Sequence, residues 1–293
     1  MSIAPLAPPF VILAAGRARR YGGCKPLAPV GIHGESVIDL VASDARQAGF
    51  GTIVLVIGPE TGPAIRYHVE HAWPSDVDVA FAVQKAPLGT VDAVLSATEF
   101  VKGGPYGVGN ADDIYGLAAA QMLCAHLSEA DPTNALVGFR LFDATIGNAP
   151  VTRGICEVSS DGHLLGLDER RMVTPSGKGD FHSADGHEPE DIPADSLVSM
   201  NLWGFTPSFH RTLEATMDAA SGASEEAEVL LPEVVGSSLA STPFSVLAAS
   251  GRCIGVTHPD DLALVQAEVN RQVGHGQRPA LLWGRTPPPI PLA

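Results

Sequence analysis

The chain has 293 residues, 45% of them hydrophobic, which is enough to bury the core of one large α/β domain and argues against a disordered chain. It carries 18 Lys and Arg against 33 Asp and Glu, so its formal net charge is −15, and a surface this acidic repels nucleic acid and anionic membranes. The four cysteines are scattered without a CxxC pair, which argues against a disulfide framework or a zinc site and predicts a reducing cytoplasm.

Buried strands and amphipathic helices alternate over the first half of the chain. A proline-rich lead-in, too short and too interrupted to span a membrane, runs into the first strand. Strand-like apolar runs occupy 10–15, 52–58, 77–84, 105–112 and 134–140. Residues with helical spacing occupy 36–48, 62–72, 89–101 and 114–128. This alternation predicts right-handed βαβ units and a Rossmann-like, mostly parallel sheet flanked by helices, with ligands at the carboxyl ends of the strands.

The second half has a different character. Two short strands around an Asp-Gly turn are expected over 154–170, and another strand over 197–205. Between them, 173–196 is rich in Gly, Pro, Asp and Ser and predicts a mobile loop, either a lid or an ordinary surface insertion. The remaining expected elements are helices at 207–219, 226–238 and 258–271, two short strands within 243–256, and a proline-rich tail at 284–293.

No repeat or linker divides the chain. We therefore predict a single α/β domain over 1–293, with a first half at about 10–140 and an inserted β-rich lobe with C-terminal helices at about 141–271.

The strongest chemical signal is the segment LAAGRARRYGGCKPLAPVG at 13–31. Four of the 18 basic residues fall within nine positions of it, namely Arg17, Arg19, Arg20 and Lys25. The glycines among them let the backbone approach a ligand closely, and fixed cations beside backbone amides suit a triphosphate. The spacing is neither that of a Walker A loop nor that of a dinucleotide fingerprint.

This segment resembles the signature loop of the nucleotidyltransferases that make nucleotide sugars. Its short Arg-to-Lys spacing also resembles the molybdenum-cofactor guanylyltransferases and small cytidylyltransferases. Gly16, Arg20 and Lys25 match the family pattern, whereas Ala18 replaces its second glycine. The resemblance, which covers about 10–271, implies a nucleotide-diphospho-sugar transferase fold whose β-rich lobe binds the acceptor. It implies that Arg20 and Lys25 are catalytic, and that the loop binds the nucleotide through Leu13, Ala14, Ala15, Gly16 and Arg17.

The segment VQKAPLGTVDAV at 83–94 is similar to the family's base-reading segment. The resemblance implies that Gln84 meets the base edge and that Gly89 and Thr90 also bind the nucleotide. By themselves these residues equally indicate a polar strand end followed by a helix cap. A Gln side chain has a donor and an acceptor, so it does not name the base.

A metal site is expected at GVGNADDIYG, residues 107–116. Two adjacent carboxylates at a strand end repel each other unless a cation lies beside them. The family has a magnesium-binding Asp here, and Asp112 matches it, while Asp113 either supports the metal through a water or caps the next helix. The family's second ligand, an Asp or Asn, aligns with Thr257, and Asp260 is expected to begin the last helix. The resemblance therefore implies Mg2+ held by Asp112, phosphate oxygens and water.

The acceptor lobe is expected to contribute Glu169, Arg170 and Asn201. The first two match a Glu-Lys pair that contacts the sugar and its phosphate in the family. Arg170 stands where Lys is usual, and Arg binds phosphate without being an equivalent donor. Trp203 and Phe205, on the strand that carries Asn201, are expected in the core.

Together these motifs imply transfer of a nucleoside monophosphate from an NTP to a sugar 1-phosphate or sugar-like cyclitol phosphate, releasing pyrophosphate. One alternative is a guanylyl- or cytidylyltransferase acting on a cofactor precursor or an alcohol phosphate. Another is a catalytically weak nucleotide-binding sensor, which only the Thr257 substitution favours. The expected partners are an NTP and a phosphorylated small molecule, without nucleic acid or membrane. Neither the base nor the oligomeric state is fixed, and a homodimer is left open.

Overall fold

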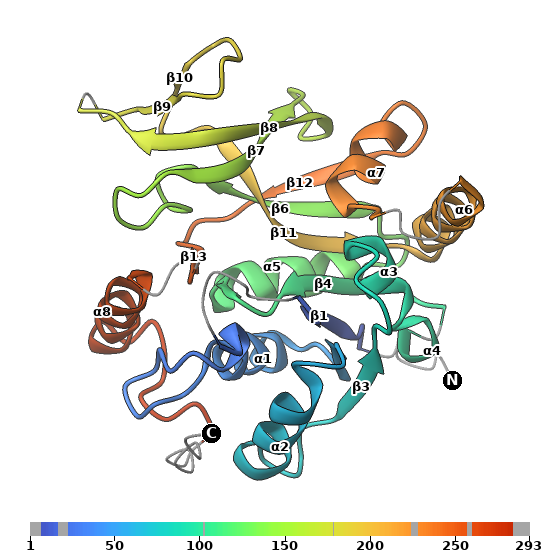
Figure 1. The fold of residues 1–293 in the computed structure, drawn as a ribbon, viewed down its shortest axis with the longest axis vertical. Helices are drawn as coiled ribbons and strands as arrows, with labels where there is room; N and C mark the ends of the chain where they lie inside the picture. The colour runs from blue at the N-terminus through green and yellow to red at the C-terminus, as the bar shows by residue number, and fades with distance from the viewer. Residues whose placement is uncertain are drawn as a thin grey trace.

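The computed structural model describes residues 7–16, 23–101, 103–177, 179–223, 228–256 and 260–283. The strands of its main sheet are β1 (Phe10–Ala14), β2 (Ile53–Ile57), β3 (Val79–Val83), β4 (Tyr106–Asn110), β6 (Asn134–Arg140), β7 (Val151–Val158), β8 (Leu164–Pro175), β9 (Phe181–Ser183), β10 (Asp191–Ile192), β11 (Leu197–Phe205) and β12 (Phe244–Ala248). The order across this sheet is β10-β9-β8-β7-β11-β4-β1-β2-β3, with β6 paired to β11 and β12 paired to β6 (Figure 1). Two short strands, β5 (Asp113–Ile114) and β13 (Ile254–Gly255), pair with each other separately.

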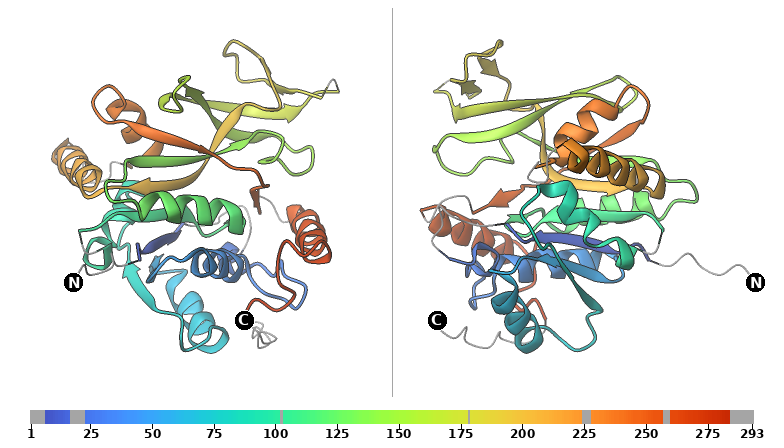
Figure 2. Two further views of the ribbon diagram at one scale, coloured as in Figure 1. Left: turned by 180° about the vertical axis from the view of Figure 1, so that it is seen from behind. Right: turned by 45° about the vertical axis from the view of Figure 1, so that its right-hand side comes forward.

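Helices cover both faces of the sheet. They are α1 (Val37–Ala48), α2 (Gly62–Ala72), α3 (Thr90–Leu95), α4 (Thr98–Val101), α5 (Leu117–Leu127), α6 (Pro207–Ala223), α7 (Leu231–Ser238) and α8 (Asp261–Gly274), with a 3-10 helix η1 (Lys25–Leu27). The right-hand view of Figure 2 shows α3, α6 and α7 grouped on one face. Among the described residues, no helix combines the length and the apolar character that crossing a membrane requires.

The central strands are buried on both faces because their side chains alternate between two cores. Ile12 packs into the cluster that includes α1 and α5, and its neighbour Val11 packs into the cluster that includes α3 and α6. Strand β1 pairs in parallel with both β2 and β4. The continuous apolar runs of the sequence are typical of such doubly covered strands. The predicted α/β fold, a mostly parallel sheet flanked by helices, is confirmed.

Strand β11 joins the two parts of the sheet. Its residues Val198 and Ser199 pair with β7, whereas Trp203 to Phe205 pair with β4. Between the two stretches its register is irregular, and Asn201 has a positive φ of 57°. The β-rich lobe of β7 to β10 therefore separates from β4 at this irregularity, and in Figure 1 it lies at the opposite end of the molecule from β1 to β3.

Two of the predicted elements were wrong. The segment 173–196, expected as a loop, completes β8 and contains β9 and β10, which extend the sheet by antiparallel pairing. Phe181 and Ile192 are both buried there. These few apolar side chains anchor strands that the polar composition of the segment does not indicate. The single helix expected over 89–101 is two short helices, and the hydroxyls of Ser96 and Thr98 bond backbone carbonyls where they meet.

Candidate active site

Two adjoining cavities lie at the carboxyl ends of β1 and β4. Their volumes are about 620 Å³ and about 590 Å³, and they are called here the first and the second cavity. Four described residues line both cavities, namely Lys25, Asn110, Asp112 and Asn201. Because parallel strands end at the same edge of a sheet, this is where a ligand of an α/β fold is expected. A ligand in one cavity can therefore meet a ligand in the other at these four residues.

The first cavity collects the predicted nucleotide-binding residues that the structure describes: Leu13, Ala14, Ala15, Gly16, Gln84, Gly89 and Thr90. Gln84, 7% exposed, donates through Nε2 to the carbonyl oxygen of Gly89 and to Asp92 Oδ2, both at 3.0 Å. Both amide hydrogens are thereby used. The side-chain oxygen of Gln84 is consequently the group that it offers to a ligand in the first cavity.

A strand-like clamp holds the turn that precedes α3. Gly89 has φ +94°. The carbonyl oxygen of the preceding residue, Leu88, accepts a hydrogen bond from Val229 N–H at 3.0 Å. Val229 O in turn accepts from Val91 N–H at 3.1 Å. Residues 88–91 are therefore positioned by a segment about 140 positions away, just before α7.

A direct ion pair marks the boundary between the cavities. Lys25 begins η1, and its Nζ donates to Asp112 Oδ2 at 2.5 Å, although the two residues are 87 positions apart. The side chains are 16% and 32% exposed, respectively, so both remain open to a ligand. A lysine beside a carboxylate at the meeting point of two cavities suits chemistry in which negative charge is transferred or shared.

Asp113 has a different environment from its neighbour Asp112. It accepts a hydrogen bond from Asn110 Nδ2 at 2.9 Å. Burial, reinforced by the charge of Asp112, raises the pKa of Asp113 to about 6. Asp113 lies in β5 and the residue before α5 is Gly116, so the predicted helix-capping role was wrong.

The irregularity in β11 presents Asn201 to both cavities. Tyr115 holds the backbone next to Asn201: its hydroxyl donates to the Met200 carbonyl at 3.0 Å and accepts from Asn110 N–H at 2.8 Å. Asn201 Oδ1 accepts from Trp203 Nε1 at 3.3 Å, which leaves the Asn201 amide nitrogen as a donor. A non-glycine residue with positive φ needs such surroundings to hold it, and residues of this kind concentrate at functional sites.

The second cavity is lined by the β-rich lobe, by α7 and by the β5–β13 pair. The predicted residue Glu169 lies in it, with a side chain that is 56% exposed and accepts from Arg171 Nη2 at 3.2 Å. Glu233 of α7 and Arg153 of β7 also line it, and neither was predicted. Burial lowers the pKa of the Arg153 guanidinium, and the carboxylate of Asp113 acts in the opposite direction.

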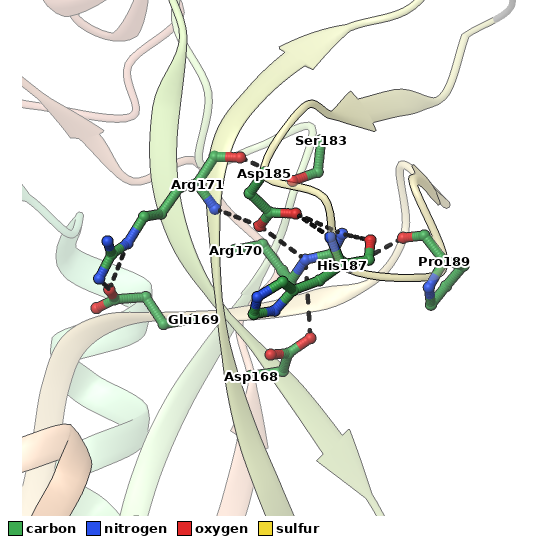
Figure 3. A network of polar contacts seen from close by, with 8 residues as sticks. All are labelled: Asp168, Glu169, Arg170, Arg171, Ser183, Asp185, His187 and Pro189. Carbon is green, nitrogen blue, oxygen red and sulfur yellow. Dashed lines mark hydrogen bonds and ion pairs between the residues drawn. The ribbon is translucent and has the colours of Figure 1, made fainter.

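Arg170 does not join this set, which corrects the expectation that it contacts the acceptor. Its guanidinium, 2% exposed, donates to both carboxylate oxygens of Asp185 at 3.0 and 3.1 Å (Figure 3). It also donates to the carbonyls of Pro189 and His187. The turn between β9 and β10 thus wraps around Arg170, which organises the lobe and is not among the residues lining either cavity.

Three predicted residues, Arg17, Arg20 and Thr257, lie outside the described residues. Of the residues that the prediction missed, Asn110 carried a usable signal, because it is the strand-end residue directly before an Ala-Asp-Asp run. Arg153 carried a weaker one, a lone cation beside Gly154 in a strand of the acceptor lobe.

Comparisons with known proteins agree with this geometry. Residues 10–140 match the family described as the MobA-like NTP transferase domain. A relative named bifunctional protein GlmU, from Hyphomonas neptunium, is 31% identical over 171 residues, which are 56% of this chain and 34% of the relative. The chain spans between 19% and 34% of the length of such curated relatives.

Two solved structures share the fold across almost the whole chain. A UDP-glucose pyrophosphorylase complexed with UDP-glucose has a TM-score of 0.65 at 13% identity, covering 91% of this chain and 100% of its own. The inositol-1-phosphate CTP transferase from T. maritima has a TM-score of 0.64 at 11% identity, covering 92% and 98%. At these identities the likeness concerns the fold.

Proposed function

We propose that the chain, whose residues 10–140 match the MobA-like NTP transferase domain, transfers a nucleoside monophosphate from an NTP to a sugar 1-phosphate or a cyclitol phosphate. One observation carries the proposal: two cavities, each large enough for a small polar ligand, meet at the Lys25–Asp112 ion pair. A reaction that joins two phosphorylated molecules requires such an arrangement. Of the two solved structures of the same fold, one is named for UDP-glucose, a nucleotide sugar, and the other for inositol 1-phosphate.

In the proposed reaction, an oxygen of the acceptor phosphate attacks the α-phosphorus of the NTP. The bond from that phosphorus to the bridging oxygen breaks in line, and pyrophosphate leaves. Such transfers depend mainly on alignment and charge neutralisation. Lys25 would stabilise the charge at the α-phosphate, and the expected role of Arg20 and the loop amides is to hold the β- and γ-phosphates.

Base recognition is assigned to the first cavity. Asp92 and the Gly89 carbonyl fix the Gln84 amide so that it offers an acceptor. The base that binds there would therefore donate an N–H to Gln84 Oε1, with the backbone amides of Gly89 and Thr90 supplying donors. Hydrogen bonds to a buried edge discriminate strongly when a wrong partner leaves a polar group unpaired.

The carboxylate of Asp112, where the two cavities meet, suits a hard divalent cation, for which we propose Mg2+. Asp112 is partly exposed and carries oxygen ligands of the kind that Mg2+ prefers. Within the described ranges, no group of three or more His, Cys, Asp or Glu forms a closed metal cage. A Mg2+ ion held by one carboxylate would keep several waters and bind substrate phosphates. When bound, it would neutralise phosphate charge and align the two reactants.

We assign the acceptor to the second cavity, where Glu169 and Asn201 are lining residues and would bind ring hydroxyls. A carboxylate accepts and an amide nitrogen donates, so together they can read both hydrogen-bonding directions of a polyhydroxylated ring.

Pyrophosphate release tests the function directly. The purified protein is incubated with Mg2+, each of ATP, GTP, CTP, UTP and dTTP, and a panel of sugar and cyclitol 1-phosphates. We expect release with one matched pair, and release slowed about 100-fold or more with the Lys25→Met variant. If the protein binds an NTP and yet releases no pyrophosphate with any acceptor, the proposed reaction is wrong and the sensor alternative gains weight.

A further inference from the structure

Arg153 is a cation of the second cavity that makes no ion pair with a carboxylate among the described residues. Among the described residues that line this cavity, the cations are Lys25 and Arg153. Lys25 is paired with Asp112. Arg153 forms no ion pair with any described residue, although its side chain is partly buried. Burying a charge without a counter-charge is costly, and proteins normally pair such groups.

Backbone carbonyls hold the Arg153 guanidinium in place. Its Nε and Nη2 donate to the carbonyl oxygen of Ala144 at 3.2 and 2.6 Å, and its Nη1 donates to that of Thr152 at 2.8 Å. A guanidinium has five N–H donors, so these contacts leave one N–H on each terminal nitrogen. Two N–H groups on the terminal nitrogens are the arrangement that binds an oxyanion bidentately.

Arg170, on the neighbouring strand, is a cation of the same lobe that is neutralised by a carboxylate. Arg153 and Arg170 are register partners on β7 and β8. Like charges opposite each other in a sheet repel, and Arg170 is compensated by Asp185. Among the described residues, Arg153 has no carboxylate at ion-pairing distance; the carboxylate of Asp113, which lines the same cavity, only partly offsets the lowering of the Arg153 pKa by burial.

Charge balance in the second cavity makes an anionic ligand the complement of Arg153. The described lining residues include the carboxylates of Asp112, Asp113, Glu169, Glu233 and Asp261. A phosphorylated acceptor would be repelled by this wall unless a cation received its phosphate. Lys25 is assigned to the α-phosphate of the nucleotide, and Arg170 is enclosed elsewhere.

We propose that Arg153 binds the phosphate of the acceptor, through the N–H groups that remain on its two terminal nitrogens. This rests on the proposed function, because it assigns the second cavity to the acceptor. Arg153 thereby takes the role that the sequence assigned to Arg170. The two bonds to the Ala144 carbonyl also tether the segment between β6 and β7. A tether needs hydrogen-bond donors but no positive charge, so tethering alone leaves the charge of Arg153 unexplained, and an anionic ligand accounts for it.

The test separates phosphate binding from tethering and from nucleotide binding. Arg153→Met removes the charge and Arg153→Lys keeps it. Arg211→Met removes an exposed charge on α6 and is the matched control. Inorganic phosphate is titrated calorimetrically onto each protein with Mg2+ and a saturating non-hydrolysable NTP analogue, and thermal melting reports the fold.

We expect phosphate to bind about 10- to 100-fold more weakly to Arg153→Met, the range expected for losing charge-assisted hydrogen bonds. Arg153→Lys should recover part of this loss, and the NTP analogue should bind all variants equally. With an active acceptor identified, its KM should rise in parallel. Equal phosphate affinity in wild type and Arg153→Met, or no phosphate binding to nucleotide-loaded wild type, overturns the proposal. Absence of NTP binding to wild type would instead refute the proposed function.

Discussion

Gly89 offers a sharp test of how the nucleotide cavity is positioned. Replacing it with Ala places a Cβ 2.3 Å from Val229 O and 2.6 Å from Val229 N, both backbone atoms that cannot swing aside. The substitution also forces an L-residue into φ +94°, ψ −178°, a region that is essentially restricted to glycine. The turn and the Val229 segment must therefore separate.

The cost follows from what that separation breaks. Three hydrogen bonds join the two segments: Val229 N–H to Leu88 O, Val91 N–H to Val229 O, and Leu231 N–H to Thr90 Oγ1. Each contributes about 1 kcal/mol, and the backbone strain adds about 2 kcal/mol. We expect Gly89→Ala to lower the free energy of unfolding by about 5 kcal/mol, measured by urea denaturation.

Gly34→Ala is the matched control, because Gly34 also has a positive φ, +88°, but a Cβ there meets nothing within 4 Å. It should lose only the backbone term, about 1–2 kcal/mol. Gly89→Ala should also bind NTP more weakly, since the Gly89 carbonyl orients Gln84. If both variants were equally stable and both bound NTP as wild type does, the clamp would have no role in positioning the cavity.

Three further predictions concern other parts of the molecule. Lys25→Met should reduce kcat about 100-fold or more while leaving the melting temperature nearly unchanged, as expected for a partly exposed group that stabilises transferring charge; a small change in kcat would contradict its assignment. Arg278→Met should lower the free energy of unfolding by about 3–5 kcal/mol in urea titrations, because it leaves the buried carboxylate of Asp44 without its bidentate partner. The Arg170 guanidinium holds the pKa of Asp185 well below its usual range, so the stability from this pair should be complete above about pH 3.8 and be lost as the pH falls further. Asp185→Asn should remove that pH dependence from acid-unfolding curves, and identical acid limbs in variant and wild type would argue against it.

Local pattern was sufficient for most of the first half of the chain. Continuous apolar runs such as 52–58 are typical of strands covered on both faces, and their alternation with helices favours the parallel pairing seen among β1, β2, β3 and β4. The β-rich lobe was harder, because 173–196 has little periodicity. Its strands depend on pairing with β8 and on the enclosure of Arg170, both of which are non-local.

The family resemblance assigned Lys25 and Asp112 to the same site. It did not predict that the two side chains form an ion pair. The sequence by itself determined the α/β class and the residue types that gather at the strand ends, since both follow from hydrophobic period and from chain order. Only the tertiary structure decided which of two facing arginines is available to a ligand. Arg170 pairs with Asp185, whereas the hydrogen bonds of Arg153 to other described residues go to carbonyls, and no local pattern records where a counter-charge 15 positions away will fold.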